Sequence, residues 1–202
     1  MSRRLVSLTL ENIGDLPTRC RACVFWELDQ VAAQRACDQG DSAWEKEAWL
    51  SDTLLEWGNC GWLGYVDNEP AGYALFAPPA YVPRSLSFPT SPVSADAVLL
   101  MTARVEERFA GGGLGRMLVQ AVAGDAAQRG TKAIEAFGYT DRREHQCLAP
   151  TEYLEAVGFT VVREHPYTPR LRLDVKTALS WREEVEYAID KLLGVSPALA
   201  QR

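Results

Sequence analysis

The sequence of 202 residues places four glycines within five positions, at Gly111, Gly112, Gly113 and Gly115. Glycine has no Cβ, so an anion can approach the backbone closely and the chain can adopt positive φ angles without strain. An apolar helical period begins directly after them, and the first N–H groups of a helix lack internal partners and lie at the positive end of its dipole. These features predict a phosphate-binding turn between a strand and a helix. The simpler alternative is a tight connection without a ligand.

The spacing of the glycines excludes two common phosphate-binding motifs. A P-loop ends in Gly-Lys-Ser/Thr, whereas this turn ends in Gly115-Arg116-Met117. The dinucleotide motif G-x-G-x-x-G would need a glycine at Arg116 or at Leu118. A phosphate ligand of another kind is therefore expected.

The turn resembles the acyl-CoA-binding segment of the GCN5-related N-acetyltransferase (GNAT) family, in which a strand ending in valine is followed by Arg/Gln-x-x-Gly-x-Gly/Ala at the start of a helix. The matching residues are Val105, Gly113, Leu114, Gly115, Arg116 and Leu118. Ala110 stands where the family usually has Arg or Gln. A second match lies at residues 153–159, Tyr-Leu-Glu-Ala-Val-Gly-Phe, which resemble the short helix and the Gly-Phe pair that close the family's core.

The resemblance implies acetyl-CoA as the cofactor, with its diphosphate on the backbone of residues 111–116 and its pantetheine arm along the strand that ends at Val105. The implied activity is transfer of an acetyl or short acyl group to a primary amine by direct attack on the thioester. Because Ala110 and Leu154 depart from the family pattern, a non-catalytic acyl-CoA-binding or sensor module is the alternative. The residues implied in cofactor binding are Arg104, Val105, Gly111, Gly112, Gly113, Leu114, Gly115 and Arg116.

Two residues are the main candidates for the proton transfers of such a reaction. Glu135 interrupts an otherwise apolar strand, where burial would make its carboxylate a stronger base; a structural carboxylate paired with a neighbour is the alternative. Tyr153 precedes Leu154, the position of the acid in many family members, so its side chain is rotated by about 100° around the helix and a packed aromatic is the alternative. His145 and Cys147 are weaker candidates for the base, and the resemblance to the family implies that a chain of waters can take the place of a dedicated base.

Hydrophobic periodicity predicts the elements that position these residues. Strands are expected over residues 5–10, 62–66, 71–76, 98–105, 132–137, 158–164 and 171–174, and helices over 16–33, 42–57, 150–157 and from 114 to a stop at Gly130. The resemblance implies an α+β (mixed α/β) fold with a central mixed, mostly antiparallel sheet flanked by helices, in which the parallel strands 98–105 and 132–137 splay apart. The proline-rich segment 77–96 is expected to form a wall of the acceptor pocket rather than a linker.

Two units are expected along the chain. Residues 1–175 would form the GNAT-like acyltransferase domain, and residues 176–202 would append an amphipathic C-terminal helix. That helix would pack on its own domain or contact a second copy, so a monomer and a homodimer are both open.

The amino-acid composition limits the kinds of partner and the location that are expected for the protein. The formal net charge of −6 argues against nucleic acid and favours a cationic acceptor, such as a small-molecule or peptide amine. No apolar stretch resembles a signal peptide or a membrane span, and five cysteines lack the spacing of a disulfide framework, so a reduced cytoplasmic protein is expected. Cys20-x-x-Cys23 has the spacing of a metal or redox motif, but no second Cys or His pair follows at ligand spacing. No metal is expected, and buried helical cysteines are the simpler interpretation.

Overall fold

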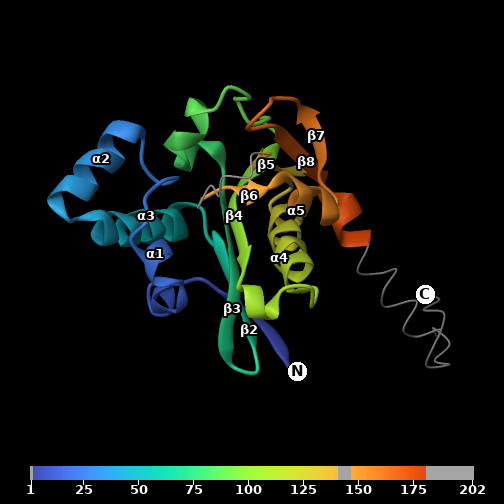
Figure 1. The fold of residues 1–202 in the computed structure, drawn as a ribbon, viewed down its shortest axis with the longest axis horizontal. Helices are drawn as coiled ribbons and strands as arrows, with labels where there is room; N and C mark the ends of the chain where they lie inside the picture. Colours follow the sequence, from blue (N-terminus) through green and yellow to red (C-terminus); the bar gives the residue numbers. More distant parts are fainter. Residues whose placement is uncertain (1, 141–146, 181–202) are drawn as a thin grey trace.

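One mixed sheet forms the centre of the protein in the computed structural model, which describes residues 2–140 and 147–180 (Figure 1). The strands follow the order β1-β2-β3-β4-β5-β8-β7, and β6 pairs with β5. Along this path, every pair is antiparallel except β4 and β5. This confirms the expected mixed, mostly antiparallel sheet. The strands are β1 Arg3–Ser7, β2 Gly61–Val66, β3 Glu69–Ala77, β4 Ala97–Val105, β5 Ala133–Tyr139, β6 Ala149–Pro150, β7 Thr160–Arg163 and β8 Arg170–Asp174.

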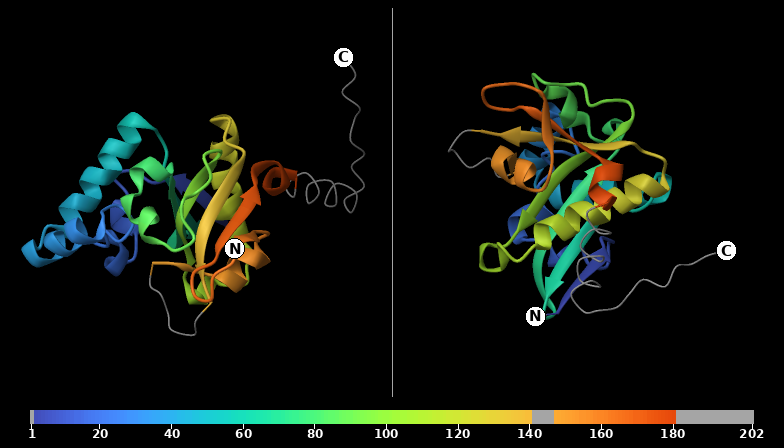
Figure 2. Two further views of the ribbon diagram at one scale, coloured as in Figure 1. Left: turned by 90° about the horizontal axis from the view of Figure 1, so that it is seen from above. Right: turned by 90° about the vertical axis from the view of Figure 1, so that its right-hand side faces the viewer.

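Helices cover both faces of the sheet, as the two views in Figure 2 show. On one face, Leu100 of β4 belongs to the core cluster that includes Leu118 of α4; on the other, Leu99 belongs to the cluster that includes Trp26 and Leu50. Adjacent strand residues point to opposite faces, so β4 contributes to both cores. The first face carries α4 Leu114–Gln128 and α5 Thr151–Ala156. The second face carries α1 Thr18–Arg21, α2 Gln30–Gln39, α3 Ser42–Glu56 and two short 3-10 helices, η2 Pro79–Tyr81 and η3 Pro83–Ser87. Two further 3-10 helices, η1 Ile13–Asp15 and η4 Glu107–Phe109, lie in connections.

The parallel strands β4 and β5 separate partway along their length. They pair only at Ala97 with Ala133, Val98 with Ile134 and Leu99 with Glu135. Beyond this point β4 continues to Val105 and β5 to Tyr139 without pairing to each other. The expected splay is therefore present.

A β-bulge lies in β4 directly after the splay begins. The register with β3 shifts between Leu75 and Phe76, which face Thr102 and Leu100, so that Met101 has no partner on β3. A bulged residue is left out of the ladder and bends the strand. The bulge therefore redirects the backbone of β4 where the two parallel strands part.

The expected helix over residues 16–33 is wrong. The chain forms α1, then an irregular segment over residues 22–29, and then α2. The Asp29 side chain accepts hydrogen bonds from the backbone N–H groups of Val31 at 2.8 Å and Ala32 at 2.9 Å, so it caps a new helix at this point. Trp26 is 3% exposed in the irregular segment. The burial of this side chain against the sheet, and not the helical spacing of apolar residues, determines the backbone conformation of the segment.

The remaining expected elements lie close to the observed ones, and the C-terminal tail is described only at its start. Residues 175–180 are helical, and residues 181–202, which contain most of the expected amphipathic helix, lie outside the described residues. The division into residues 1–175 and 176–202 stays a prediction. Within the described residues, no helix has the length and apolarity needed to cross a bilayer.

Candidate active site

The glycine turn before α4 adopts a conformation that only glycine tolerates easily. Gly111 has φ 74° and Gly113, the residue that precedes the helix, has φ 83°. No side chain caps this end of α4. In the described part of the chain, the backbone N–H groups of residues 111–115 make no hydrogen bond to another protein group. These donors are free to bind an anion at the positive end of the helix.

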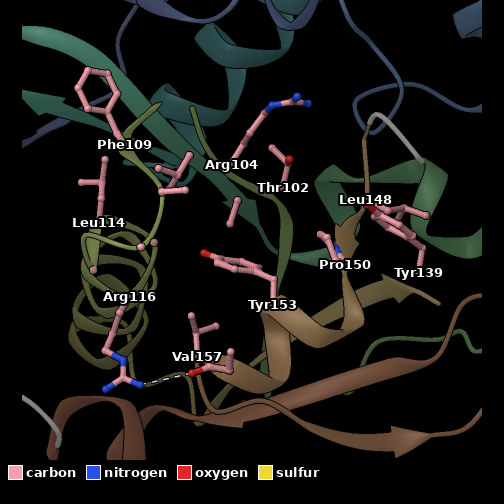
Figure 3. Close-up of a pocket in the computed structure, with 17 residues that line it drawn as sticks. Thr102, Arg104, Phe109, Leu114, Arg116, Tyr139, Leu148, Pro150, Tyr153 and Val157 are labelled. Carbon is pink, nitrogen blue, oxygen red and sulfur yellow. Dashed lines mark hydrogen bonds between the residues drawn. The ribbon is translucent and has the colours of Figure 1, made fainter. Parts of the chain in front are cut away.

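A cavity of about 710 Å³ opens beside this turn (Figure 3). It lies between the start of α4, the end of β4, β6 and α5, where β4 and β5 have separated. Apolar side chains form most of its wall, with few polar groups, as in many small-molecule sites. The lining residues are Thr102, Ala103, Arg104, Val105, Phe109, Ala110, Gly111, Gly113, Leu114, Gly115, Arg116, Tyr139, Leu148, Pro150, Tyr153, Ala156 and Val157.

Most of the residues predicted to bind the cofactor line this cavity, and Gly112 is the exception. Figure 3 shows Arg104 pointing away from Tyr153, so this residue borders the cavity without directing its charge to the centre. The Arg116 guanidinium donates to the carbonyl oxygen of Ala156 at 3.3 Å. Arg116 therefore joins α4 to α5 across one edge of the cavity.

The side chain of Arg3 lies beside the glycine turn, and the sequence analysis did not predict this residue as part of the site. A Cβ added to Gly112 would be 3.3 Å from one terminal nitrogen of Arg3, and a Cβ on Gly113 would be 3.8 Å from the other. An arginine fork beside free N–H groups is well suited to a phosphate. No local pattern could have found it, because β1 and the turn are separated by about half the chain.

Tyr153 and Leu154 have opposite surroundings. Leu154 is fully buried in the core, whereas Tyr153 points into the cavity. The Tyr153 hydroxyl is buried without a hydrogen-bond partner, and burial raises the pKa of Tyr153 to about 12. The phenol is therefore protonated at neutral pH and has a free hydrogen bond to donate.

Glu135 lies in an ion-pair network and does not line the cavity. Its side chain is fully buried and accepts hydrogen bonds from Arg170, from Arg172 at 3.2 Å and from the backbone N–H of Ser94 at 3.1 Å. Arg172 also binds Asp96 through two hydrogen bonds of 2.9 and 3.0 Å. These are the contacts of a paired structural carboxylate, so the geometry speaks against the expected role of Glu135 as the base.

A second, much smaller cavity of about 20 Å³ lies behind β4. It contains a buried ion pair between Lys46 and Glu27, which the sequence did not reveal. Thr102 lines both this cavity and the larger one, so the bulged part of β4 separates them. The lining residues are Cys20, Cys23, Trp26, Glu27, Lys46, Tyr73, Leu75, Thr102 and Cys147.

Two other expectations concern residues near the site. His145 lies outside the described residues, so its role stays untested. The segment 77–96 lines neither cavity; it packs instead, with Phe88 stacked on Phe137 at a centroid distance of 4.3 Å and on Trp26 at 5.3 Å. In the described ranges, no group of three or more His, Cys, Asp or Glu residues is arranged to hold a metal ion.

A splayed mixed sheet with free amides at a glycine turn is the arrangement of an acyl-CoA-dependent transferase. Residues 24–149 match the sequence model of the acetyltransferase (GNAT) family, so the chain belongs to this family. The family uses acetyl-CoA, and the matched residues include both splayed strands and the glycine turn. Comparison with curated proteins finds no match in sequence.

Solved structures support the fold at low sequence identity. The PaiA N-acetyltransferase of Thermoplasma acidophilum in complex with coenzyme A has a TM-score of 0.57 and 10% identity, over 86% of this chain and 99% of that one. A putative GNAT acetyltransferase of Desulfovibrio desulfuricans has a TM-score of 0.54 and 17% identity over 86% and 99%. An N-acetyltransferase of Staphylococcus aureus Mu50 has a TM-score of 0.54 and 12% identity over 87% and 99%.

Proposed function

We propose that this protein is an N-acetyltransferase that moves an acetyl or short acyl group from acetyl-CoA to a primary amine of a small molecule or a peptide. The observation that carries the proposal is the glycine turn with free N–H groups beside a cavity that opens at the strand splay. When bound, acetyl-CoA supplies an activated thioester that an amine can attack without a covalent enzyme intermediate. The protein then has to bind, orient and move protons.

Cofactor binding is assigned to the backbone of residues 111–115 and to Arg3. The free N–H groups and the Arg3 fork would bind the diphosphate. The backbone at the β4 bulge, next to Thr102, is assigned the hydrogen bond to the thioester carbonyl, because Met101 has no partner on β3. The open edge of β4 beyond Leu99 would lie along the pantetheine arm.

Tyr153 is the proposed proton donor to the departing thiolate. Its hydroxyl carries its proton at neutral pH and has no hydrogen-bond partner in the described part of the protein, so this proton is available for transfer. Its hydroxyl now lies beside Gly115, so it also suits a hydrogen-bond donor to the cofactor phosphates. A Tyr153→Phe variant separates these roles: loss of the acid lowers kcat by about 100-fold at unchanged CoA affinity, whereas loss of a phosphate contact raises the Kd of CoA at unchanged kcat.

Removal of the amine proton is assigned to water. No Asp or Glu in the described chain lines the larger cavity, and Glu135 is fully paired. The acceptor is proposed to approach from the side of the smaller cavity, because Thr102 borders both cavities.

We also propose a cytoplasmic location, since all five cysteines are free thiols.

The first experiment measures cofactor binding by thermal shift. Acetyl-CoA at 100 times its Kd should stabilise the protein by about 2.7 kcal/mol, a rise in Tm of roughly 5 to 10 °C for a chain of this size. A Gly112→Asp variant adds a negative charge to the turn at a residue without positive φ, and the shift should be lost. Gly124→Asp, a site on α4 where a Cβ meets no atom within 4 Å, is the matched control and should keep it.

The second experiment measures transfer. A panel of aminoglycosides, polyamines, amino acids and peptides with free N-termini is tested for CoA thiol release. Turnover with any amine supports the transferase. A thermal shift that Gly112→Asp abolishes, together with no turnover on any amine, would favour the acyl-CoA sensor. No shift with CoA or acetyl-CoA in the unmodified protein would reject both functions.

A further inference from the structure

Three of the five cysteines meet at the smaller cavity. Cys20, Cys23 and Cys147 all line it, and the sulfurs of Cys23 and Cys147 are 3.3 Å apart although the residues are separated by 124 positions. Cys37 is exposed elsewhere, and Cys60 is buried. The close partner of Cys23 is therefore Cys147, and not Cys20, its neighbour in the C-x-x-C spacing.

The two thiols are held in place by the surrounding structure. The indole N–H of Trp26 donates to the carbonyl oxygen of Cys147 at 2.9 Å, which ties the chain before β6 to the irregular segment 22–29. A disulfide requires a sulfur–sulfur distance of about 2.05 Å, so the sulfurs would have to approach by roughly 1.3 Å from their present 3.3 Å. Formation of the bond therefore requires the two side chains to rotate toward each other.

The surroundings also favour the thiolate form of one of the two sulfurs. The hydrogen bond with Cys147 lowers the pKa of Cys23 to about 6, helped by a backbone hydrogen bond at Phe25 and by the Lys46 ammonium, while burial and Glu27 oppose it. The same contact, together with burial, raises the pKa of Cys147. A thiolate beside a thiol is the arrangement of an attacking and a resolving cysteine.

We propose that Cys23 and Cys147 are a redox-active dithiol, which a hydroperoxide converts to an intramolecular disulfide. The Cys23 thiolate attacks one peroxide oxygen, the O–O bond breaks, and after protonation a sulfenic acid and one water (or an alcohol) result. The Cys147 sulfur then attacks the Cys23 sulfur, its proton leaves with the hydroxyl group as water, and the S–S bond forms. The two sulfurs lose two electrons in total, and the peroxide gains them.

The position of this pair gives the disulfide a consequence for catalysis, which rests on the proposed function. Cys147 directly precedes Leu148, which lines the larger cavity, and Cys23 and Cys147 line the smaller cavity together with Thr102. The disulfide would fix the two walls of the smaller cavity to each other on the side proposed for the acceptor. Oxidation is expected to lower amine turnover without changing the affinity for CoA.

The test uses the reduced full chain, treated with hydrogen peroxide and then with an alkylating agent. Trypsin cleaves after Arg21, so Cys20 and Cys23 fall on different peptides. The expected result is a loss of two alkylatable thiols, a mass decrease of two hydrogens, and a cross-linked pair of peptides that contain Cys23 and Cys147. In Cys147→Ser the disulfide should be absent and dimedone should label Cys23, whereas Cys37→Ser and Cys20→Ser should still form the cross-link.

Several outcomes would overturn the proposal. A Cys20–Cys23 cross-link, or no disulfide in a protein whose Cys37 has been oxidised, would refute the dithiol. If the cross-link forms fully and amine turnover stays unchanged, the catalytic consequence is refuted while the disulfide stands. If the reduced protein shows no transferase activity at all, the proposed function fails, and the peptide map still decides whether the dithiol exists.

Discussion

The hydroxyl of Tyr153 lies against Gly115, at a distance of only 2.8 Å from where a Cβ on Gly115 would stand. Real Cβ atoms essentially never approach another atom this closely, so the absence of a side chain at Gly115 lets the aromatic ring of α5 reach the first turn of α4. This contact joins a candidate catalytic side chain to the proposed diphosphate-binding turn. One of the predictions below tests this contact, and another tests the burial of the Tyr153 hydroxyl.

Gly115→Ala should weaken the binding of CoA without destabilising the free protein. Alanine is favoured over glycine in a helix by about 1 kcal/mol, but its methyl group would push the Tyr153 ring into the cavity. An increase in Kd of about tenfold, or about 1.4 kcal/mol, is expected from calorimetry. In the background of Tyr153→Ala the same change should cost less; equal costs in both backgrounds would show that the two residues are not coupled.

Arg3→Ala should weaken the binding of CoA, and Arg4→Ala should not. The Arg3 guanidinium lies beside Gly112, whereas that of Arg4 lies 4.2 Å from the ring centre of Tyr65. Because Arg3 is exposed, the expected loss is about 1 kcal/mol and should shrink as salt is added. Comparing CoA, dephospho-CoA and pantetheine locates the contact. A diphosphate contact predicts equal losses for the first two ligands and none for pantetheine.

Glu135→Gln should destabilise the fold. Removing one charge from a buried pair costs about 3 kcal/mol or more, which lowers the Tm by roughly 6 to 12 °C in a chain of this size. Asp174→Asn is the matched control, since Asp174 pairs with Arg172 at 3.4 Å but its side chain is 63% exposed. An unchanged Tm combined with a 100-fold lower kcat would instead support the role of Glu135 as a base.

Tyr153 should make the protein less stable at alkaline pH. Its pKa rises from the ordinary value of 10.0 to about 12 in the folded state, because burial disfavours the charged phenolate. Between these two pH values the folded state keeps a proton that the unfolded chain releases. The contribution of Tyr153 to the free energy of unfolding is therefore fully present below pH 10 and is lost between pH 10 and about 12. Tm measured from pH 8 to 12 should fall less steeply in Tyr153→Phe. An identical slope in both proteins would contradict the burial of this hydroxyl.

The sequence alone was enough to predict the glycine turn before α4 and most of the elements around it. The glycines at 111–115, the helical period from Leu114 and the alternating strands are local patterns, because each depends on residues that are neighbours in the chain. These local patterns also locate the residues whose backbone N–H groups are proposed to bind the cofactor. Local period failed over residues 16–33, where the Asp29 cap and the burial of Trp26 interrupt a helix that the pattern alone favoured.

Only the tertiary structure decided what the side chains around the turn do. Glu135 looked like a base because an isolated carboxylate in a buried strand is costly, and the arginines that neutralise it stand 35 and 37 residues further on. Arg3 reaches the turn from β1, Tyr153 rather than Leu154 faces the cavity, and Cys23 meets Cys147 across 124 residues. The physical reason is the same in each case. Chain-local spacing fixes backbone conformation, while pairing between distant side chains depends on how the sheet and its covering helices pack.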